Sequence, residues 1–310
     1  MKKGISIIIC TYNGSYRLLE ILNNIEKLNA LDFAVEVIII NNNSNDNTEK
    51  ILNNYFEQKP FRFPFHIVFE NRQGLVFAKI CGLKNASFDY VIFCDDDNIL
   101  DINYAIKCFT NFENNPQTGI MGGKGFPKSK IKLPEWFNQY KNAYAVGEQA
   151  DKPGFLEYPK FFLWGAGMCV RKKAVDIDFL EKYSHLVCGR TGNKLIAGED
   201  ALFCISALQK GYKLYYDPDL QFYHIIEENR LKTDYLKNLL FGLGYSYSVL
   251  LKIYREIILK DKNSLKVITK DFIYLFYVFV KHLLNFNSFD RLKAHYFMGS
   301  MKGILKPIKL

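Results

Sequence analysis

The sequence predicts an α/β fold: an open, doubly wound and mostly parallel sheet with helices on both faces, followed by a C-terminal helical extension. Strand and helix patterns alternate over the first hundred residues, an order typical of a parallel sheet. The segment Val35–Ile40 is dominated by β-branched residues, as expected for a parallel strand buried on both faces. Residues 226–310 instead read as long, basic helices. We therefore expect a first domain over residues 1–225, divided near residue 100 into two halves, and an extension over 226–310.

The alternation begins at the N-terminus. The predicted elements are, in order, strand Ile5–Cys10, helix Tyr16–Leu28, strand Val35–Ile40, helix Thr48–Phe56, strand His66–Phe69, helix Leu75–Ala86 and strand Tyr90–Cys94. Further along, Ala201–Leu208 predicts a helix and Leu220–Tyr223 a strand. The intervening segment Gly119–Tyr158 is rich in Gly, Pro, Lys and aromatic residues, which predicts mobile loops around a ligand site.

The composition is that of a globular protein. Of the 310 residues, 49% are hydrophobic, which is enough for a sizeable core and excludes wholesale disorder. The seven cysteines lie mostly in apolar runs without CxxC or Cys/His spacing, which indicates buried thiols in a reducing compartment rather than disulfides or a zinc site. Ile5–Cys10 is too short for the apolar core of a signal peptide, so we expect no export and a cytoplasmic location.

The net charge of +9 is concentrated in the extension. Residues 1–225 carry 26 Lys and Arg against 25 Asp and Glu, whereas residues 226–310 carry 15 against 7, a balance of +8. Two helices are predicted there, Thr233–Lys260 and Ser264–Asn285. The longest apolar run, Phe272–Val280, would span only about 14 Å as a helix, too little to cross a bilayer. Two interpretations stay open: the helices lie at the inner membrane face, held by anionic lipids, or they pack on the first domain or form a homodimer.

Three consecutive aspartates, Asp95, Asp96 and Asp97, directly follow the buried strand Tyr90–Cys94. Adjacent carboxylates repel one another and resist burial, so stability alone does not explain them. At the carboxyl end of a strand they would suit Mg²⁺ or Mn²⁺, and such an ion attracts a diphosphate. The structural alternative is an acidic turn that caps a helix over Ile99–Phe112.

Polar loops follow the first two strands as well. Thr11-Tyr12-Asn13 follows the first strand, and Asn41-Asn42-Asn43-Ser44 follows the second. In an open parallel sheet, ligands bind beyond the carboxyl ends of the strands, so these loops and the aspartates are expected around one crevice. Neither GxGxxG nor GxxxxGK[ST] occurs, so the sequence has no dinucleotide fingerprint and no P-loop.

Taken together, these segments resemble the GT-A glycosyltransferases of family 2, over about residue 4 to His224. The matching motifs are Ser6–Asn13, Val37–Thr48, Asn71–Gly74 with Ala78, Lys79 and Gly82, the DxD motif Asp95-Asp96-Asp97, Trp164–Met168 with Arg171, and Gly198-Glu199-Asp200. The resemblance implies a GT-A fold and metal-dependent transfer of a hexosyl or N-acetylhexosaminyl group. Two positions depart from the pattern: Asn41 stands where the family usually has an aspartate that contacts the nucleobase, and Lys79 where an arginine is common.

The resemblance also implies roles for individual residues. Asp97 is expected as the principal metal ligand, Asp95 on the ribose or the metal, and His224 as a further ligand unless it is an ordinary core or surface histidine. The nucleotide-sugar site is expected to comprise Thr11, Tyr12, Asn13, Asn41, Asn43, Lys79, Asp95 and Asp96. Tyr12 offers a ring for the base to stack on.

Asp200 is the expected general base, which removes the proton from the attacking hydroxyl. Because a helix start lowers the pKa of a carboxyl group, burial or a partner such as Glu199 is needed to make it a base; Glu199 could instead bind an acceptor hydroxyl. Trp164, Gly165 and Arg171 are expected on the acceptor side. The structural alternatives are an N-cap for Asp200 and plain core for Trp164.

The resulting hypothesis is an inverting glycosyltransferase that uses Mn²⁺ or Mg²⁺, prefers a UDP-sugar donor, and acts on a glycan or lipid-linked glycan in surface polysaccharide synthesis. A sugar-nucleotide nucleotidyltransferase is the first alternative, although Thr11–Gly14 lacks the Gly-rich basic loop of such enzymes. A nucleic-acid binder is the second, but the basic extension is heavily aliphatic and has no known nucleic-acid-binding pattern, so we expect no nucleic acid. A non-catalytic scaffold is the third, and the intact carboxylates argue against it.

Overall fold

The computed structural model describes residues 2–30, 32–58, 60–187, 190–191, 194–195, 197–261, 265–284 and 288–307. The first half alternates strand and helix as predicted. Its elements are β1 (Lys2–Thr11), α1 (Leu18–Ile25), β2 (Ala34–Asn41), α2 (Thr48–Gln58), β3 (Phe65–Phe69), α3 (Leu75–Asn85) and β4 (Phe88–Asp95). Strand β1 runs parallel to β2 and β4, and β2 runs parallel to β3.

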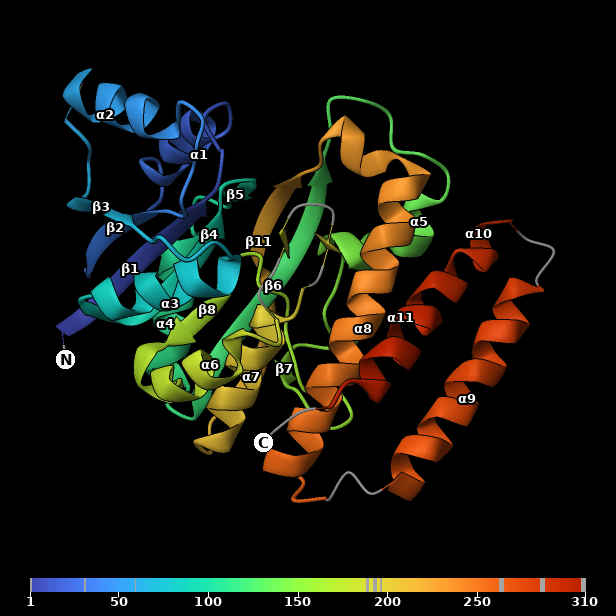
Figure 1. Cartoon of the computed structure of the whole chain (residues 1–310). Coiled ribbons are helices and arrows are strands. Elements are labelled where there is room, and N and C mark those ends of the chain that lie inside the picture. Colours follow the sequence, from blue (N-terminus) through green and yellow to red (C-terminus); the bar gives the residue numbers. More distant parts are fainter. Residues whose placement is uncertain are drawn as a thin grey trace.

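The second half adds strands of 2 to 13 residues, several of which pair antiparallel. Its elements are β5 (Asn98–Leu100), α4 (Tyr104–Asn114), β6 (Thr118–Lys128), α5 (Phe137–Tyr140), η1 (Lys141–Tyr144), β7 (Gly154–Phe155), β8 (Cys169–Arg171), η2 (Lys172–Ala174), α6 (Ile177–Ser184), β9 (Arg190–Thr191), β10 (Lys194–Leu195), α7 (Glu199–Gln209) and β11 (Lys213–Ile225). The main sheet has the order β3-β2-β1-β4-β8-β6-β11-β5, with β7 paired to β11, and helices cover both of its faces (Figure 1).

Successive side chains of the central strands pack into two different hydrophobic cores, one on each face of the sheet. Ile8 of β1 and Phe93 of β4 belong to one cluster with α3, α6 and α7, whereas Ile7 and Ile92 belong to another with α1 and α4. Because successive side chains in a strand point to opposite faces, a strand that is apolar at every position must be covered on both. This explains why the β-branched runs predicted the doubly wound sheet correctly.

In the second half, one structural alternative and part of one expectation do not hold. The acidic turn does not cap a helix, because Asn98–Leu100 forms β5 directly after the aspartates and pairs antiparallel with β11; helix α4 begins only at Tyr104. The segment Gly119–Tyr158 is not loop throughout, because β6 fills its first part and lies inside the sheet between β8 and β11. Strand β6 contains several glycines, and because they have no side chain, the alternation of residues that predicts a strand is not visible there.

The extension contains η3 (Glu228–Leu231), α8 (Thr233–Ile257), α9 (Leu265–Leu283), α10 (Ser288–Arg291) and α11 (Lys293–Leu305). The two predicted helices are confirmed as α8 and α9, and α11 was not foreseen. Helix α8 joins the core of the first domain through Val249, Leu250 and Ile253. Helices α8 and α11 approach so closely that a Cβ on Gly244 would lie 1.9 Å from the carbonyl oxygen of Tyr296. Helix α9 is the outermost of the three (Figure 1).

Cysteine burial matches the prediction where the structure describes it. Five of the six described cysteines are buried, the exception being the half-buried Cys81, and none of the six forms a disulfide. Cys188 lies outside the described residues. Within the described part of the chain, no helix has the length and apolarity needed to cross a membrane.

Candidate active site

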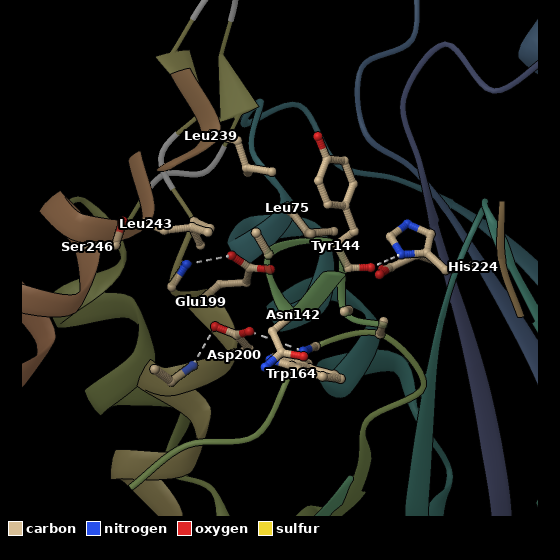
Figure 2. A pocket seen from close by; sticks show the side chains of 18 of the residues that line it. Leu75, Asn142, Tyr144, Trp164, Glu199, Asp200, His224, Leu239, Leu243 and Ser246 are labelled. Carbon is tan, nitrogen blue, oxygen red and sulfur yellow. Dashed lines mark hydrogen bonds between the residues drawn. The ribbon is translucent and has the colours of Figure 1, made fainter. Parts of the chain in front are cut away.

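A cavity of about 730 Å³ opens at the carboxyl ends of β1 and β4 and extends to helix α8. It brings together most of the residues predicted from the sequence. Those that line it are Thr11, Tyr12, Asp95, Asp96, Asp97, Trp164, Gly165, Glu199, Asp200 and His224. Figure 2 shows Glu199 and Asp200 on one side of the cavity and His224 on the other. The cavity therefore has a carboxylate at the start of α7 facing a second acidic group after β4.

Asp96 is the buried member of the acidic group, and the half-buried Asp95 precedes it. The Thr11 hydroxyl donates to Asp96 Oδ2 at 2.7 Å, and Arg17 Nη2 donates to the same oxygen at 2.9 Å. Burial nevertheless raises the pKa of Asp96, since it outweighs the attraction of Arg17. Burial, opposed by Lys79 and assisted by Asp97, raises the pKa of Asp95 to about 6. Asp95 Oδ1 is buried without a hydrogen-bond partner in the described structure.

Asp97 faces His224 across the end of the sheet. His224 Nδ1 donates to the backbone carbonyl of Tyr144 at 2.6 Å, which leaves Nε2 as the ring nitrogen that faces the acidic group. That nitrogen lies 3.2 Å from Asp97 Oδ2. Arg230 Nη1 lies 2.9 Å from Asp97 Oδ2 and 3.4 Å from His224 Nε2, so the guanidinium cation contacts both atoms, and a metal ion bound by this pair would have to displace it.

The donor set therefore fits a divalent metal in part. Asp97 and His224 supply a ligand pair, and the unpartnered Asp95 Oδ1 is a further oxygen of the kind that Mg²⁺ and Mn²⁺ prefer. Among the described residues, however, no three His, Cys, Asp or Glu side chains lie close enough to enclose an ion by themselves. Remaining ligands would have to come from water or from a bound diphosphate, as is usual for Mg²⁺.

Two arginines complete this acidic group, and the sequence analysis missed both. Arg230 Nη1 donates to Asp97 Oδ2 at 2.9 Å, and Arg17 donates to Asp96 and, at 3.1 Å, to Glu227. Both arginines line the cavity. Arg230 follows His224 by six residues, and Arg17 stands just before α1. These positions carry no signal of their own, because 133 and 79 residues separate the arginines from the aspartates they bind.

The Gly198 loop places Asp200 at the edge of the cavity. Asp200 Oδ2 accepts a hydrogen bond from Gly165 N at 3.1 Å, and Oδ1 accepts one from Ala201 N at 2.7 Å. Burial, followed by the repulsion of Glu199, raises the pKa of Asp200 to about 7, although Lys79 and the two backbone bonds oppose the shift. A carboxyl group with this pKa can hold or release a proton near neutral pH, as a general base requires.

Lys79 does not line the cavity, contrary to its expected contact with the nucleotide sugar. It is buried beneath the floor, where Nζ lies 3.4 Å from Glu199 Oε1. Burial opposes the ammonium charge, but Glu199, Asp95 and Asp200 outweigh it and raise the pKa of Lys79. Gly165 leaves room for this lysine, because a Cβ there would lie 2.6 Å from Nζ. From beneath the cavity floor, the ammonium group of Lys79 therefore balances the negative charge of Glu199, Asp95 and Asp200.

Arg171, expected on the acceptor side, does not line the cavity, and its guanidinium is held by backbone carbonyls instead. Nε donates to the carbonyl of Thr118 at 2.8 Å, and Nη2 donates to the carbonyls of Phe112 at 2.7 Å and Asn115 at 3.2 Å. Arg171 thus ties β8 to the end of α4 and the start of β6. A buried arginine that satisfies several carbonyls serves packing.

Three asparagines assigned to the nucleotide site do not line the cavity either: Asn13, Asn41 and Asn43. Asn41 Oδ1 accepts a hydrogen bond from Ser44 N, and Asn13 Oδ1 accepts one from Asn45 N, so both shape the loop after β2. Asn42 lines the cavity instead, and its Oδ1 accepts a bond from Gly74 N at 2.8 Å.

Helix α8 supplies one wall of the cavity, which the sequence did not indicate. Its contribution is mostly apolar and includes Leu239, Leu243 and Leu250, joined by Tyr296 from α11. Leu239 and Leu243 are seen beside Glu199 in Figure 2. The opposite wall is more polar: Trp164 N donates to Gln149 Oε1 at 2.6 Å. The cavity can therefore hold a ligand with both polar and apolar parts.

Comparisons with known proteins give a consistent picture. A sequence profile described as Glycosyl transferase family 2 matches residues 6–178, more than half of the chain. The poly-beta-1,6-N-acetyl-D-glucosamine synthase of Staphylococcus epidermidis is 31% identical over 131 residues, which are 42% of this chain and 31% of that protein. The match thus spans about a third of the curated relative's length.

Solved structures extend the likeness over nearly the whole chain. The S. aureus TarS 1–349 structure superimposes with a TM-score of 0.53 at 15% identity and covers 96% of this chain and 90% of its own. The mannosyltransferase PcManGT from Pyrobaculum calidifontis, in complex with GDP-Man and Mn²⁺, superimposes with a TM-score of 0.58 at 14% identity and covers 98% and 88%. At such identities the likeness concerns the fold alone, and the expected GT-A fold with a C-terminal helical extension is confirmed.

Proposed function

The chain belongs to glycosyl transferase family 2, and from this premise we propose that it transfers a sugar from a nucleotide-sugar donor to a hydroxyl group of a glycan acceptor. One observation carries the proposal. A carboxyl group suited to accept a proton near neutral pH, Asp200, lines the same cavity as the acidic group Asp95–Asp97. Such a cavity can bind a diphosphate through cations held at the acidic group, where Arg17 and Arg230 also lie, and deprotonate a hydroxyl group at Asp200.

The donor side of the proposal rests on the loops after β1, β2 and β4. Thr11, Tyr12 and Asp95 offer hydrogen bonds and a ring face to a nucleoside, and Asn42 holds the loops around them through the carbonyls of Glu70 and Arg72 and the N–H of Gly74. A UDP-sugar is the favoured donor, and UDP-N-acetylglucosamine is the first to test. This preference is supported by the name of the poly-beta-1,6-N-acetyl-D-glucosamine synthase and by a TarS structure in complex with UDP-GlcNAc.

We further propose that Asp97 and His224, with Asp95, hold Mn²⁺ or Mg²⁺. The bound ion would supply positive charge against the diphosphate. Arg17 and Arg230 line the same region and could bind phosphate oxygens in a bidentate manner, as guanidinium groups do. The PcManGT complex, which contains Mn²⁺, gives further support.

Asp200 is the proposed base. Its Oδ2 and Oδ1 are held by the N–H groups of Gly165 and Ala201, which fix the direction of the carboxylate. After accepting the proton from the acceptor hydroxyl, Asp200 would leave an oxygen nucleophile for direct displacement and inversion at the anomeric carbon. Because Asp200 must be ionised for this step, the rate should rise with pH through about pH 7.

The acceptor is proposed to be a glycan or lipid-linked glycan in surface polysaccharide synthesis. The apolar wall of Leu239, Leu243 and Leu250 beside the base supports an acceptor with an apolar part. We place the protein in the cytoplasm, at the inner membrane face. A homodimer stays a prediction without a specific contact to support it.

Calorimetric titration of UDP, GDP and dTDP, each with and without Mn²⁺, tests the donor proposal. We expect one nucleotide, UDP, to bind with Mn²⁺ and to bind at least about tenfold more weakly to Asp97→Ala, because the metal links protein and diphosphate. Asp200→Asn is the matched control: it removes a carboxylate from the same cavity but should keep UDP affinity while abolishing transfer from UDP-N-acetylglucosamine. Equal nucleotide binding by wild type and Asp97→Ala would contradict the metal assignment.

A further inference from the structure

The outward face of α9 is apolar, which is the reverse of an ordinary surface helix. Six large apolar side chains of this helix and the residue after it are more than half exposed. They are Ile273 (62%), Tyr274 (63%), Phe276 (53%), Tyr277 (64%), Leu283 (51%) and Leu284 (71%). Exposed apolar side chains scattered singly are normal, but a contiguous group marks an interaction surface. We call these six residues the α9 face.

The α9 face follows helical spacing. Ile273, Tyr274, Tyr277 and Leu284 are separated by one, three and seven residues, which places them along one side of the helix. The exposed lysines Lys270 and Lys281 fall on the same side, near the two ends of the face.

The opposite side of α9 fixes the helix to the protein. Asp271 forms an ion pair with Arg255 of α8 at 2.5 Å. His282 stacks on Phe297 of α11 with ring centroids 5.4 Å apart. These contacts hold the helix against α8 and α11 from within, and its apolar side is presented outward. Figure 1 shows α9 on the outside of the helical extension, with α8 and α11 between it and the sheet.

The charge of the extension distinguishes between three possible partners of the α9 face: a second copy of the chain, a nucleic acid and a membrane. Residues 226–310 carry a balance of +8, whereas residues 1–225 carry only +1. A second copy docked on this face would bring two extensions of the same strong charge together, which is unfavourable. A nucleic acid would match the charge but would gain little from a face with six large apolar side chains. A bilayer with anionic headgroups matches both the charge and the apolar surface.

We propose that α9 is a membrane-docking helix, which lies flat in the headgroup region of an anionic bilayer with Ile273, Phe276 and Leu284 inserted. Its 19 residues would extend about 28 Å along the membrane surface. Tyr274 and Tyr277 suit the boundary between headgroups and acyl chains, and Lys270 and Lys281 reach anionic headgroups. This goes beyond the transfer reaction, because it assigns a separate surface and its partner and does not depend on the donor or the metal.

Co-sedimentation of the full chain with lipid vesicles tests the proposal. Vesicles of phosphatidylcholine alone are compared with vesicles that also contain phosphatidylglycerol. We expect the protein to bind the vesicles that contain phosphatidylglycerol, and we expect this binding to weaken as the salt concentration is raised. The triple substitution Ile273→Ser, Phe276→Ser and Leu284→Ser should weaken binding by about tenfold or more, because it removes the inserting side chains.

Two further variants make the result specific. Lys270→Gln with Lys281→Gln keeps the apolar face and should lower affinity for anionic vesicles by about fivefold per lysine, since each contributes about 1 kcal/mol near such a surface. Ile67→Ser with Phe69→Ser on the edge strand β3 removes two other exposed apolar side chains, 39% and 53% exposed, and should leave vesicle binding unchanged.

Three results would overturn the proposal. Wild type that fails to sediment with anionic vesicles rules out the membrane, and so does equal binding by wild type and the triple variant. Light scattering that finds a dimeric wild type and a monomeric triple variant would assign the face to a second copy. Circular dichroism and UDP titration of each variant establish that it is folded. Failure of UDP binding in wild type would count against the proposed reaction and not against membrane docking.

Discussion

Asp200→Asn should remove a contribution that lowers the free energy of unfolding as the pH rises. Burial and the neighbouring Glu199 raise the pKa of Asp200 from 3.8 to about 7 in the folded protein. Between these values the folded state keeps a proton that the unfolded chain has lost. The free energy of unfolding must therefore fall as pH rises, since folding then requires a carboxyl group either to take up a proton or to be buried with its charge.

The size of the penalty follows from the shift. Through Asp200, wild type loses stability steadily between about pH 4 and pH 7, and this contribution levels off above pH 7 at about 4 kcal/mol. Asparagine does not titrate, but its amide group can accept only one of the bonds from Gly165 N and Ala201 N, which costs about 1–3 kcal/mol at every pH. The variant should thus be less stable than wild type at pH 4 and more stable, by about 1–3 kcal/mol, at pH 8.

Urea unfolding of wild type and Asp200→Asn, at constant ionic strength from pH 4.5 to pH 8, measures the difference directly. Asp234→Asn is the control, because Lys237 lowers the pKa of Asp234 at the exposed start of α8. A lowered pKa places any pH dependence below the tested range, so the control should differ from wild type by a constant amount. A difference between Asp200→Asn and wild type that stays flat from pH 5 to pH 8 would refute the account of Asp200 as a carboxyl group with a raised pKa.

Three further substitutions test the packing around the site. Arg171→Met should lower the free energy of unfolding by about 2–4 kcal/mol, because it leaves buried carbonyls unpaired, while UDP affinity stays unchanged; a specific loss of UDP affinity would restore a binding role. Lys79→Met should cost about 3–5 kcal/mol by leaving Glu199 buried without its cation, and a stability equal to wild type would contradict the ion pair. Gly244→Ala places a Cβ 1.9 Å from the carbonyl oxygen of Tyr296, so the melting temperature should fall by several degrees as α8 and α11 separate; an unchanged value would contradict their close approach.

Local patterns were sufficient to predict the sheet and the carboxylates. The β-branched run of β2 and the aspartates that end β4 carry their information within a few residues, because strand burial and the position after a strand are local properties. Gly198-Glu199-Asp200 at the start of α7 was instead singled out by its resemblance to a family motif. These predictions place the polar groups at the carboxyl ends of the strands, where the cavity is found.

Residues whose role depends on distant partners could not be predicted in this way. Arg171 was assigned to the acceptor because it follows a motif, but its carbonyl partners lie more than 50 residues earlier in the chain. Asn41 stands at the position expected for a base contact, yet its side chain is used by Ser44 N in the same loop. Strand β6 was read as loop because its glycines have no side chains; one of them, Gly123, lies where a Cβ would approach the Leu220 carbonyl to 1.8 Å.

The division into a first domain and a separate extension at residue 225 is where the sequence is least informative about function. Arg230 lies beyond that boundary and binds Asp97, and Leu250 of α8 packs so closely on Gly198 that a Cβ there would lie 2.6 Å from its Cδ1. Gly198 has φ of +124° and directly precedes Glu199 and Asp200. Because α8 both holds this loop and lines the cavity, the proposed base is positioned by the extension. The smallest unit with a complete site must therefore include α8. The boundary at residue 225 marks a change in net charge, but it does not separate the site from the rest of the chain.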